Sequence, residues 1–306
     1  RLAALTETPA ESVLPFSTGV IGEPLPSDLI AAALPAAVDN LRQDNWRRAS
    51  GAILTTDTQP KLHSLEVDLA GQSCRITGIA KGAGMVCPDM ATMPSFVATD
   101  AAIDADLLDE LLRAAVDASL NRITVDGDTS TNDAVTLSAT GQSGVKIEAG
   151  STQADQFADA LTTVMIQLAQ DIVRDGEGAT KFVEIRVTGG ESIEACDQVG
   201  RTIAHSPLVK TALFASDPNW GRILAAIGRA GLSNLDTDAV SIHINGVLIA
   251  EQGARAASYT EAQGQAAMAA GDLIIDVALN RGHAEGVIWT TDLSYDYVKI
   301  NAEYRT

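Results

Sequence analysis

Apolar positions recur with helical spacing in several stretches of the chain. Residues 105–120 place leucine and alanine every three to four positions, as on one side of a helix. The same spacing predicts a long helix over residues 151–175, with Ser151 as its N-cap. The first residues look like the end of a helix. Further helices are expected at residues 27–41, 191–205 and 260–271, and a short one after the loop at 217–222.

Alternating apolar and polar residues predict β-strands elsewhere. Residues 64–69 and 73–79 both alternate, and the Ala70-Gly-Gln72 link between them predicts a hairpin. Helices and strands are interspersed, and many neighbouring strands lie close enough in sequence to form hairpins. We therefore expect an α+β fold with mixed or antiparallel sheets layered against helices, not a doubly wound parallel sheet. The other expected strands are residues 52–58, 95–99, 134–138, 182–188, 239–244, 247–250, 273–278, 286–289 and 293–300.

Length and charge restrict the class of protein. A chain of 306 residues can bury a large core and hold one or two domains. Its net charge of −19 would repel phosphate backbones, so we expect no nucleic-acid partner. No apolar run reaches 18 residues, and the start lacks the apolar core of a signal peptide. A cytoplasmic enzyme with no membrane contact is the expectation.

The cysteines and histidines give no metal or disulfide pattern. Three widely spaced cysteines, an odd number, argue against a disulfide framework and fit a reducing compartment. Cys87 has no motif that places a histidine beside it, so a small buried thiol is expected. The four histidines show no spacing typical of metal ligands, and we expect no metal site.

The glycine-rich stretch at residues 81–93 contains an unusual candidate nucleophile, Thr92. A threonine hydroxyl keeps its proton at neutral pH and usually has no base beside it. A cut before Thr92 would place a free α-amine, with a pKa of about 8, next to that hydroxyl as a base. Pro88 and the glycines suit a strained backbone, and the small Ala91 leaves the scissile carbonyl open. An ordinary structural threonine is the more frequent use of such a residue.

Three motifs together favour a nucleophilic Thr92 over a structural one. Pro15-Phe-Ser-Thr-Gly-Val-Ile-Gly22, Lys81-Gly-Ala-Gly-Met85 and Pro88-Asp-Met-Ala-Thr-Met93 resemble the ornithine acetyltransferase (glutamate N-acetyltransferase) family of arginine biosynthesis. The resemblance runs from about residue 13 to residue 306. These enzymes are similar to N-terminal-nucleophile hydrolases in their activation and mechanism.

This resemblance implies an autoprocessed transferase. The chain would be cut between Ala91 and Thr92, giving fragments 1–91 and 92–306 that share one core and associate as a heterotetramer with two copies of each. The enzyme would transfer an acetyl group from N2-acetylornithine to glutamate through acetyl-Thr92. It would need no metal or organic cofactor, and acetyl-coenzyme A would be a co-substrate only if a synthase-type activity is also present. The family usually carries further residues before the first motif, so either this chain is incomplete or the fold lacks some strands.

The resemblance also assigns individual residues. Thr18, through its hydroxyl, and Gly19, through its backbone N–H, would form the oxyanion hole. Without the resemblance, a segment that simply caps or turns the chain would be the preferred interpretation. Thr56 is an alternative to Thr58 for one substrate-binding position. Pro94 stands where the family usually has leucine and could slow self-cleavage. The residues assigned to substrate binding are Thr58, Lys81, Thr92, Glu177, Asn301 and Thr306.

Each binding residue also has an ordinary structural explanation. Lysines such as Lys81 are most often surface charges, and the glycines around Glu177 are typical of a helix C-cap. A chain end such as residues 301–306 is normally frayed. Two other functions stay open: an autoprocessed aminopeptidase or amidase of similar fold, and an uncleaved protein that binds ligands without chemistry.

Overall fold

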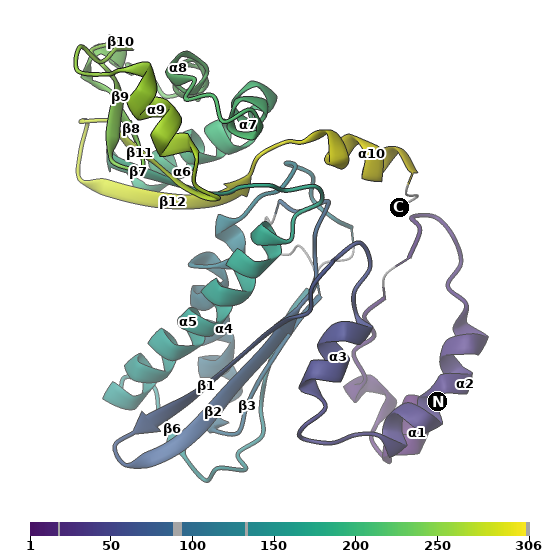
Figure 1. The fold of residues 1–306 in the computed structure, drawn as a ribbon. Helices are drawn as coiled ribbons and strands as arrows, with labels where there is room; N and C mark the ends of the chain where they lie inside the picture. The colour runs from purple at the N-terminus through teal and green to yellow at the C-terminus, as the bar shows by residue number, and fades with distance from the viewer. Residues whose placement is uncertain (18, 88–93, 132–133, 304–306) are drawn as a thin grey trace.

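The computed structural model describes residues 1–17, 19–87, 94–131 and 134–303, and its two large mixed sheets each carry their own helices (Figure 1). The first sheet has the strand order β1-β2-β3-β5, in which only β3 and β5 run parallel. Helices α4 and α5 lie along this sheet, and α5 packs against β1 and β2. The elements of this half are β1 (Lys61–Leu69), β2 (Gln72–Ala80), β3 (Pro94–Thr99), β5 (Ala134–Ala139), α4 (Ala105–Asp117) and α5 (Thr152–Arg174).

The second sheet has the order β10-β9-β8-β11-β7-β12, with β7 and β11 parallel and the other pairs antiparallel. Helix α6 packs on β7 and β12, α7 and α8 pack against α6, and α9 contacts β8 and β9. The elements of this half are β7 (Phe182–Gly190), β8 (Ser241–Ile244), β9 (Val247–Glu251), β10 (Ala254–Arg255), β11 (Asp272–Ala278), β12 (Ala284–Thr291), α6 (Ile193–Ala204), α7 (Pro207–Phe214), α8 (Trp220–Gly228) and α9 (Glu261–Met268).

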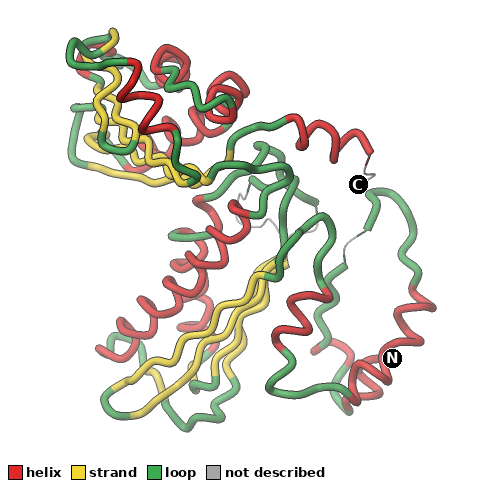
Figure 2. The backbone as a smooth tube through the Cα atoms, viewed as in Figure 1, coloured by secondary structure: helices red, strands yellow, loops and turns green. Residues whose placement is uncertain are grey.

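The ends of the described chain lie apart from the two sheets. Helices α1 and α2 bury no residue, whereas α3 packs against β1 and β2. Helix α10 follows β12, and Figure 2 shows loops gathered between α10 and the nearer end of the first sheet. The remaining elements are α1 (Leu2–Thr6), α2 (Ser27–Asp39), α3 (Trp46–Ala52), α10 (Tyr295–Glu303), the short strands β4 (Ala102–Ile103) and β6 (Lys146–Ile147), and the 3-10 helices Ala10–Ser12, Leu120–Arg122 and Thr237–Ala239.

The turn between β1 and β2 sets the register of the first sheet. Ala70 and Gly71 form a two-residue turn with φ values of 58° and 86°, the left-handed pair that a type I′ hairpin requires. The pairing then runs without a bulge to Lys61 opposite Ala80. The hairpin therefore brings Lys61 close to the start of the glycine-rich stretch at residue 81.

Helix α5 forms because its N-terminus is capped and its apolar face is buried. The Ser151 hydroxyl oxygen accepts the backbone N–H of Ala154 at 3.1 Å. Phe157 and Leu161 are fully buried, and burial of such a side chain contributes about 1.5–3 kcal/mol. The helix is thereby fixed on the sheet, and its C-cap, Asp175, lies beside the glycine-rich stretch.

The predicted α+β class with mixed sheets is confirmed, but the strand predicted over residues 52–58 is wrong. Ala52 ends helix α3, and the following residues form a loop. In that loop the Asp57 carboxylate accepts the backbone N–H of Thr55 at 3.1 Å. A side chain thus satisfies a donor that a strand would have satisfied by pairing.

The strand predicted over residues 293–300 is also wrong, because this segment forms helix α10. The Ser294 hydroxyl oxygen accepts the backbone N–H groups of Asp296 and Tyr297 at 3.2 and 3.3 Å, which caps the first helical turn. The alternation that indicated a strand does not reflect burial, since Tyr295 is 83% exposed. Helix α7 was not predicted either; it is capped by Ser206 and begins with Pro207.

Candidate active site

A cavity of about 320 Å³ opens where the first sheet, the end of α5 and helix α10 meet. It brings together Gly19, Lys81, Glu177 and Asn301, four of the residues that the sequence assigned to catalysis or substrate binding. These residues come from four widely separated parts of the chain. The cavity is lined by Gly19, Ile21, Thr55, Thr56, Lys81, Gly84, Met85, Pro94, Asp126, Asp128, Thr129, Ser130, Thr131, Glu177, Tyr297 and Asn301.

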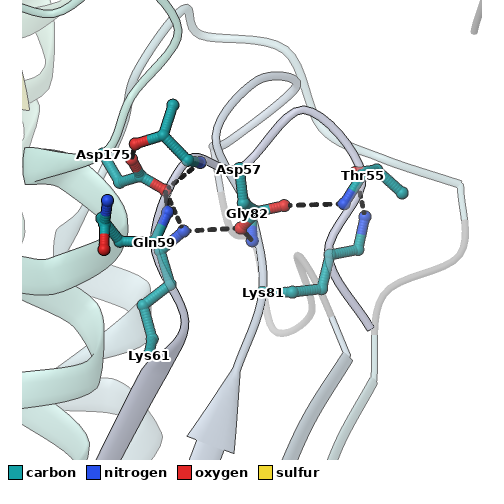
Figure 3. A network of polar contacts seen from close by, with 8 residues as sticks. Thr55, Asp57, Gln59, Lys61, Lys81, Gly82 and Asp175 are labelled. Atoms are coloured by element: carbon teal, nitrogen blue, oxygen red, sulfur yellow. Dashed lines mark hydrogen bonds and ion pairs between the residues drawn. The ribbon is translucent and has the colours of Figure 1, made fainter. Parts of the chain in front are cut away.

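Lys81 enters the cavity directly after strand β2 ends. Its ammonium donates a hydrogen bond to the Thr55 hydroxyl at 3.2 Å (Figure 3). Thr55 and Thr56 both line the cavity, whereas Thr58 is not among the described lining residues. The Thr58 N–H and hydroxyl instead donate to the Asp175 carboxylate. Of the two threonines proposed for this substrate-binding position, Thr56 lines the cavity that Lys81 enters, and Thr58 does not.

A buried ion cluster holds this side of the cavity in place (Figure 3). The Lys61 ammonium, 1% exposed, donates to Asp57 and Asp175 at 2.5 Å each. Asp57 also accepts the backbone N–H of Gly82 at 2.7 Å and that of Thr55. The cluster thus ties the loop after α3, the start of β1, the glycine-rich stretch and the end of α5 together.

The charge on Asp57 is stabilised by these neighbours. Burial would raise the pKa of the Asp57 carboxyl, but the hydrogen bond and charge of Lys61 and the two backbone N–H groups outweigh it, and the pKa lies below its ordinary value of 3.8. The carboxylate is therefore charged at neutral pH, and it accepts the backbone N–H groups of Thr55 and of Gly82, the residue after Lys81.

Glu177 reaches the cavity from the loop after α5 and lies directly against Gly84. Its backbone N–H donates to the carbonyl of Ala83 at 2.8 Å, and its carboxylate accepts the Asn301 amide at 2.7 Å. A Cβ on Gly84 would lie 2.4 Å from the Glu177 carboxyl carbon. A side chain at position 84 would therefore displace the Glu177 carboxylate from its present place in the cavity.

The comparisons with known proteins identify the family. The model of the ArgJ family matches residues 1–306. This chain belongs to the ArgJ family. The arginine biosynthesis bifunctional protein ArgJ of Pseudomonas syringae pv. tomato is 53% identical over 307 residues, covering all of this chain and 76% of that protein. Its counterpart in Methylococcus capsulatus is 55% identical over 306 residues, covering all of this chain and 75% of that protein.

A solved member of the ArgJ family supports the fold. The crystal structure of arginine biosynthesis bifunctional protein ArgJ from Bacillus halodurans is 39% identical, with a TM-score of 0.64. The match covers 67% of this chain and 96% of the solved chain. The family expected from the sequence motifs is thus confirmed, and with it an enzyme that acts on small molecules.

Several predicted residues lie outside the described part of the chain. They are Thr18, Ala91, Thr92 and Thr306. Gly19, which follows Thr18, and Pro94, two positions after Thr92, both line the cavity.

Asp126 and Tyr297 are cavity residues that the sequence did not reveal as functional. The Asp126 carboxylate accepts the backbone N–H groups of Met85 and Val86 at 2.7 and 3.0 Å, and the Tyr297 hydroxyl at 3.3 Å. Burial and the nearby Asp126 charge raise the pKa of Tyr297 far above its ordinary value, so its hydroxyl stays a donor. No local motif could indicate this contact, because 171 positions separate the two residues.

The structure places a histidine beside Cys87, which no sequence motif indicated. The Cys87 sulfur lies 3.5 Å from Nε2 of His205, the residue that ends α6. Burial raises the pKa of the Cys87 thiol and lowers the pKa of His205, so the pair is neutral at pH 7 and Cys87 is not a thiolate nucleophile. All three cysteines are free.

The described residues contain neither a metal-binding cluster nor a helix that could span a membrane. No group of three or more histidine, cysteine, aspartate and glutamate side chains is arranged to hold a metal ion in this part of the chain. Among the described helices, none has the length and apolar character needed to cross a membrane.

Proposed function

We propose that this protein transfers an acetyl group from N2-acetylornithine to glutamate through an acetyl ester on Thr92, as a step of arginine biosynthesis. The observation that carries the proposal is the cavity that collects Gly19, Lys81, Glu177 and Asn301. Membership of the ArgJ family supports the same substrates, because relatives that are 53–55% identical are named arginine biosynthesis bifunctional proteins.

Activation begins with self-cleavage. The Thr92 hydroxyl attacks the carbonyl carbon of Ala91, the peptide C–N bond breaks, and the hydroxyl proton passes to the freed α-amine. Water then hydrolyses the resulting ester, so the fragment of residues 1–91 ends in a new carboxylate and Thr92 keeps a free amine. That amine, with an ordinary pKa of about 8, is the base for turnover.

In turnover the same hydroxyl attacks the acetyl group of N2-acetylornithine. Gly19 N–H and the Thr18 hydroxyl would stabilise the tetrahedral oxyanion, ornithine leaves, and glutamate accepts the acetyl group from acetyl-Thr92. The Lys81 ammonium suits the substrate's α-carboxylate, and the Glu177 carboxylate, held by Asn301, suits the cationic end of ornithine.

The packing of the core supports fragments that stay associated after cleavage. One hydrophobic cluster contains residues from both sides of Thr92, such as Ile76 and Leu168, so two fragments would stay together after a cut.

The remaining parts of the proposal rest on the family resemblance and on the composition of the chain. The transfer uses no metal or organic cofactor, and acetyl-coenzyme A is a donor only if the second, synthase-type activity is present. The two fragments associate as a heterotetramer with two copies of each, and the enzyme works in the cytoplasm.

Intact mass and N-terminal sequencing of the purified protein test the mechanism. A new N-terminus at Thr92-Met-Pro94 is expected, and the 92–306 fragment should gain one acetyl group on brief exposure to N2-acetylornithine. Thr92→Ala should stay uncut, while Thr92→Ser, which keeps a hydroxyl, should still cleave. An uncut wild-type chain would remove the proposed base and overturn the mechanism.

Product analysis separates transfer from hydrolysis. Acetyl transfer predicts that ornithine release continues over many turnovers only when glutamate is present. An aminopeptidase or amidase of similar fold would release the acyl group to water at the same rate without glutamate.

A further inference from the structure

The carboxylate of Asp126 holds the backbone just before the proposed cleavage segment. It accepts the N–H groups of two successive residues, Met85 and Val86, at 2.7 and 3.0 Å. Asp126 itself is fixed, because the residue before it, Val125, donates its backbone N–H to the Val86 carbonyl at 2.8 Å. Tyr297 from α10 donates to the same carboxylate at 3.3 Å.

These bonds support a backbone conformation that methionine disfavours. Met85 has φ of 52°, in the left-handed region where a Cβ crowds the neighbouring carbonyl. Such a conformation persists only when surrounding contacts determine it. Hydrogen bonds from backbone N–H groups to a carboxylate are stronger than those between neutral groups, so Asp126 supplies such contacts.

The described chain resumes at Pro94 after the proposed cut, and this residue is held as well. The Lys81 backbone N–H donates to the Pro94 carbonyl at 3.4 Å, and Pro94 begins strand β3. On the other side of the cut, the Thr129 hydroxyl donates to the Cys87 carbonyl at 2.9 Å. Cys87 and Pro94, the described residues on the two sides of the proposed cut, are therefore both held by hydrogen bonds.

We propose that Asp126 is a positioning residue for self-cleavage before Thr92, and this inference rests on the proposed function. By fixing Met85 and Val86, Asp126 limits the conformations of the following residues before the hydroxyl attacks. An attack within one chain is fast only when the reacting groups are already oriented, so a loose anchor slows the first step. Asp126 acts through the backbone and does not take part in the bond changes.

The test compares the self-cleavage rates of purified, uncut precursors by intact mass. Asp126→Asn keeps the size of the side chain but places an NH2 group or a weaker acceptor against the two N–H groups. It is expected to slow cleavage about 10- to 100-fold. Asp68→Asn is the matched control, because Asp68 accepts the N–H of Gly71 at 2.6 Å in the distant β1–β2 turn. It should cleave at the wild-type rate.

A second variant separates positioning from general loss of structure. Glycine adopts positive φ without the cost that methionine incurs, so Met85→Gly added to Asp126→Asn should restore cleavage by about threefold or more. A defect caused by damage elsewhere in the fold would not respond to a glycine at position 85.

The outcomes distinguish this inference from the proposed function. A wild-type chain that stays uncut would remove both. A wild-type chain that cleaves while Asp126→Asn cleaves equally fast would overturn the role of Asp126 and leave the proposed function standing. Equal slowing by Asp68→Asn, or no restoration by Met85→Gly, would also overturn it.

Discussion

The two least exposed lysines of the described chain, Lys61 and Lys210, are stabilised in different ways. Lys61, 1% exposed, lies beside the cavity with its ammonium between the carboxylates of Asp57 and Asp175. Lys210, 3% exposed, lies in α7, where its described hydrogen-bond partners are the neutral oxygens of Thr290 and Thr291. One ammonium thus has anionic partners, and the other has dipoles alone.

The difference in hydrogen-bond partners affects the charges of Asp57 and Lys210. Burial lowers the pKa of Lys210 to about 8, although the more distant charges of Asp292 and Asp126 oppose the shift. Around Lys61 the pKa of Asp57 is lowered despite burial, because the cation favours the charged carboxylate. The Asp57 carboxylate beside the cavity therefore stays charged at neutral pH, while Lys210 can lose its proton near pH 8.

The largest expected effect comes from removing Lys61. Lys61→Met leaves two buried carboxylates without a cation, so the free energy of unfolding should fall by about 3–5 kcal/mol. Urea denaturation of the purified protein at pH 7 measures the loss.

Lys210→Met is the matched control for that experiment. It leaves only neutral oxygens without a donor, and the expected loss is about 1–3 kcal/mol. If both variants lose the same free energy, the carboxylate partners do not distinguish the two sites and the comparison fails.

The free energy of unfolding, measured as a function of pH, tests the lowered pKa of Lys210. Between pH 8 and 10.5 the folded protein has released the Lys210 proton while the unfolded chain still holds it. The unfolded state then binds more protons, so this group makes stability rise with pH, by at most about 1.4 kcal/mol per pH unit. Below pH 8 and above pH 10.5 both states have the same protonation, and the contribution is flat.

The free energy of unfolding of the wild type minus that of Lys210→Met isolates this slope. We expect the difference to grow by about 1 kcal/mol per pH unit across the window. Parallel curves for the two proteins would contradict a lowered pKa at Lys210.

The sequence predicts the parts of the fold that depend on neighbours in the chain. The apolar repeat of α5 and the turn at Ala70 and Gly71 are local signals, and both elements form where they were expected. The family motifs likewise led to Lys81, Glu177 and Asn301, which share one cavity.

Contacts across long sequence separations were not predictable in the same way. Lys61 and Asp175 are 114 positions apart, and Cys87 and His205 are 118 apart, so no spacing rule links either pair. The alternation of apolar and polar residues in α10 predicts a strand, but the segment is helical. Alternation indicates a strand only where one face is buried, and α10 buries no residue. The same absence of local signal concealed Asp126, whose partners are backbone groups.

The smallest effect concerns the acid side of the Lys61 cluster. Asp57→Asn removes a carboxylate whose pKa in the folded protein lies below the unfolded value of 3.8. The wild type is therefore more stable than the variant above pH 3.8. It loses this advantage as the pH falls through the folded pKa and the carboxylate takes up a proton. At pH 7 we expect the variant to be about 1–2 kcal/mol less stable, and urea denaturation at successively lower pH should show the gap closing below pH 3.8. Asp68→Asn, which alters an exposed turn, should differ from the wild type by less than about 1 kcal/mol. A gap for Asp57→Asn that stays constant into the acid range would mean that Lys61 does not hold Asp57 in its charged form. The contrast between the two lysines would then rest on Lys210 alone.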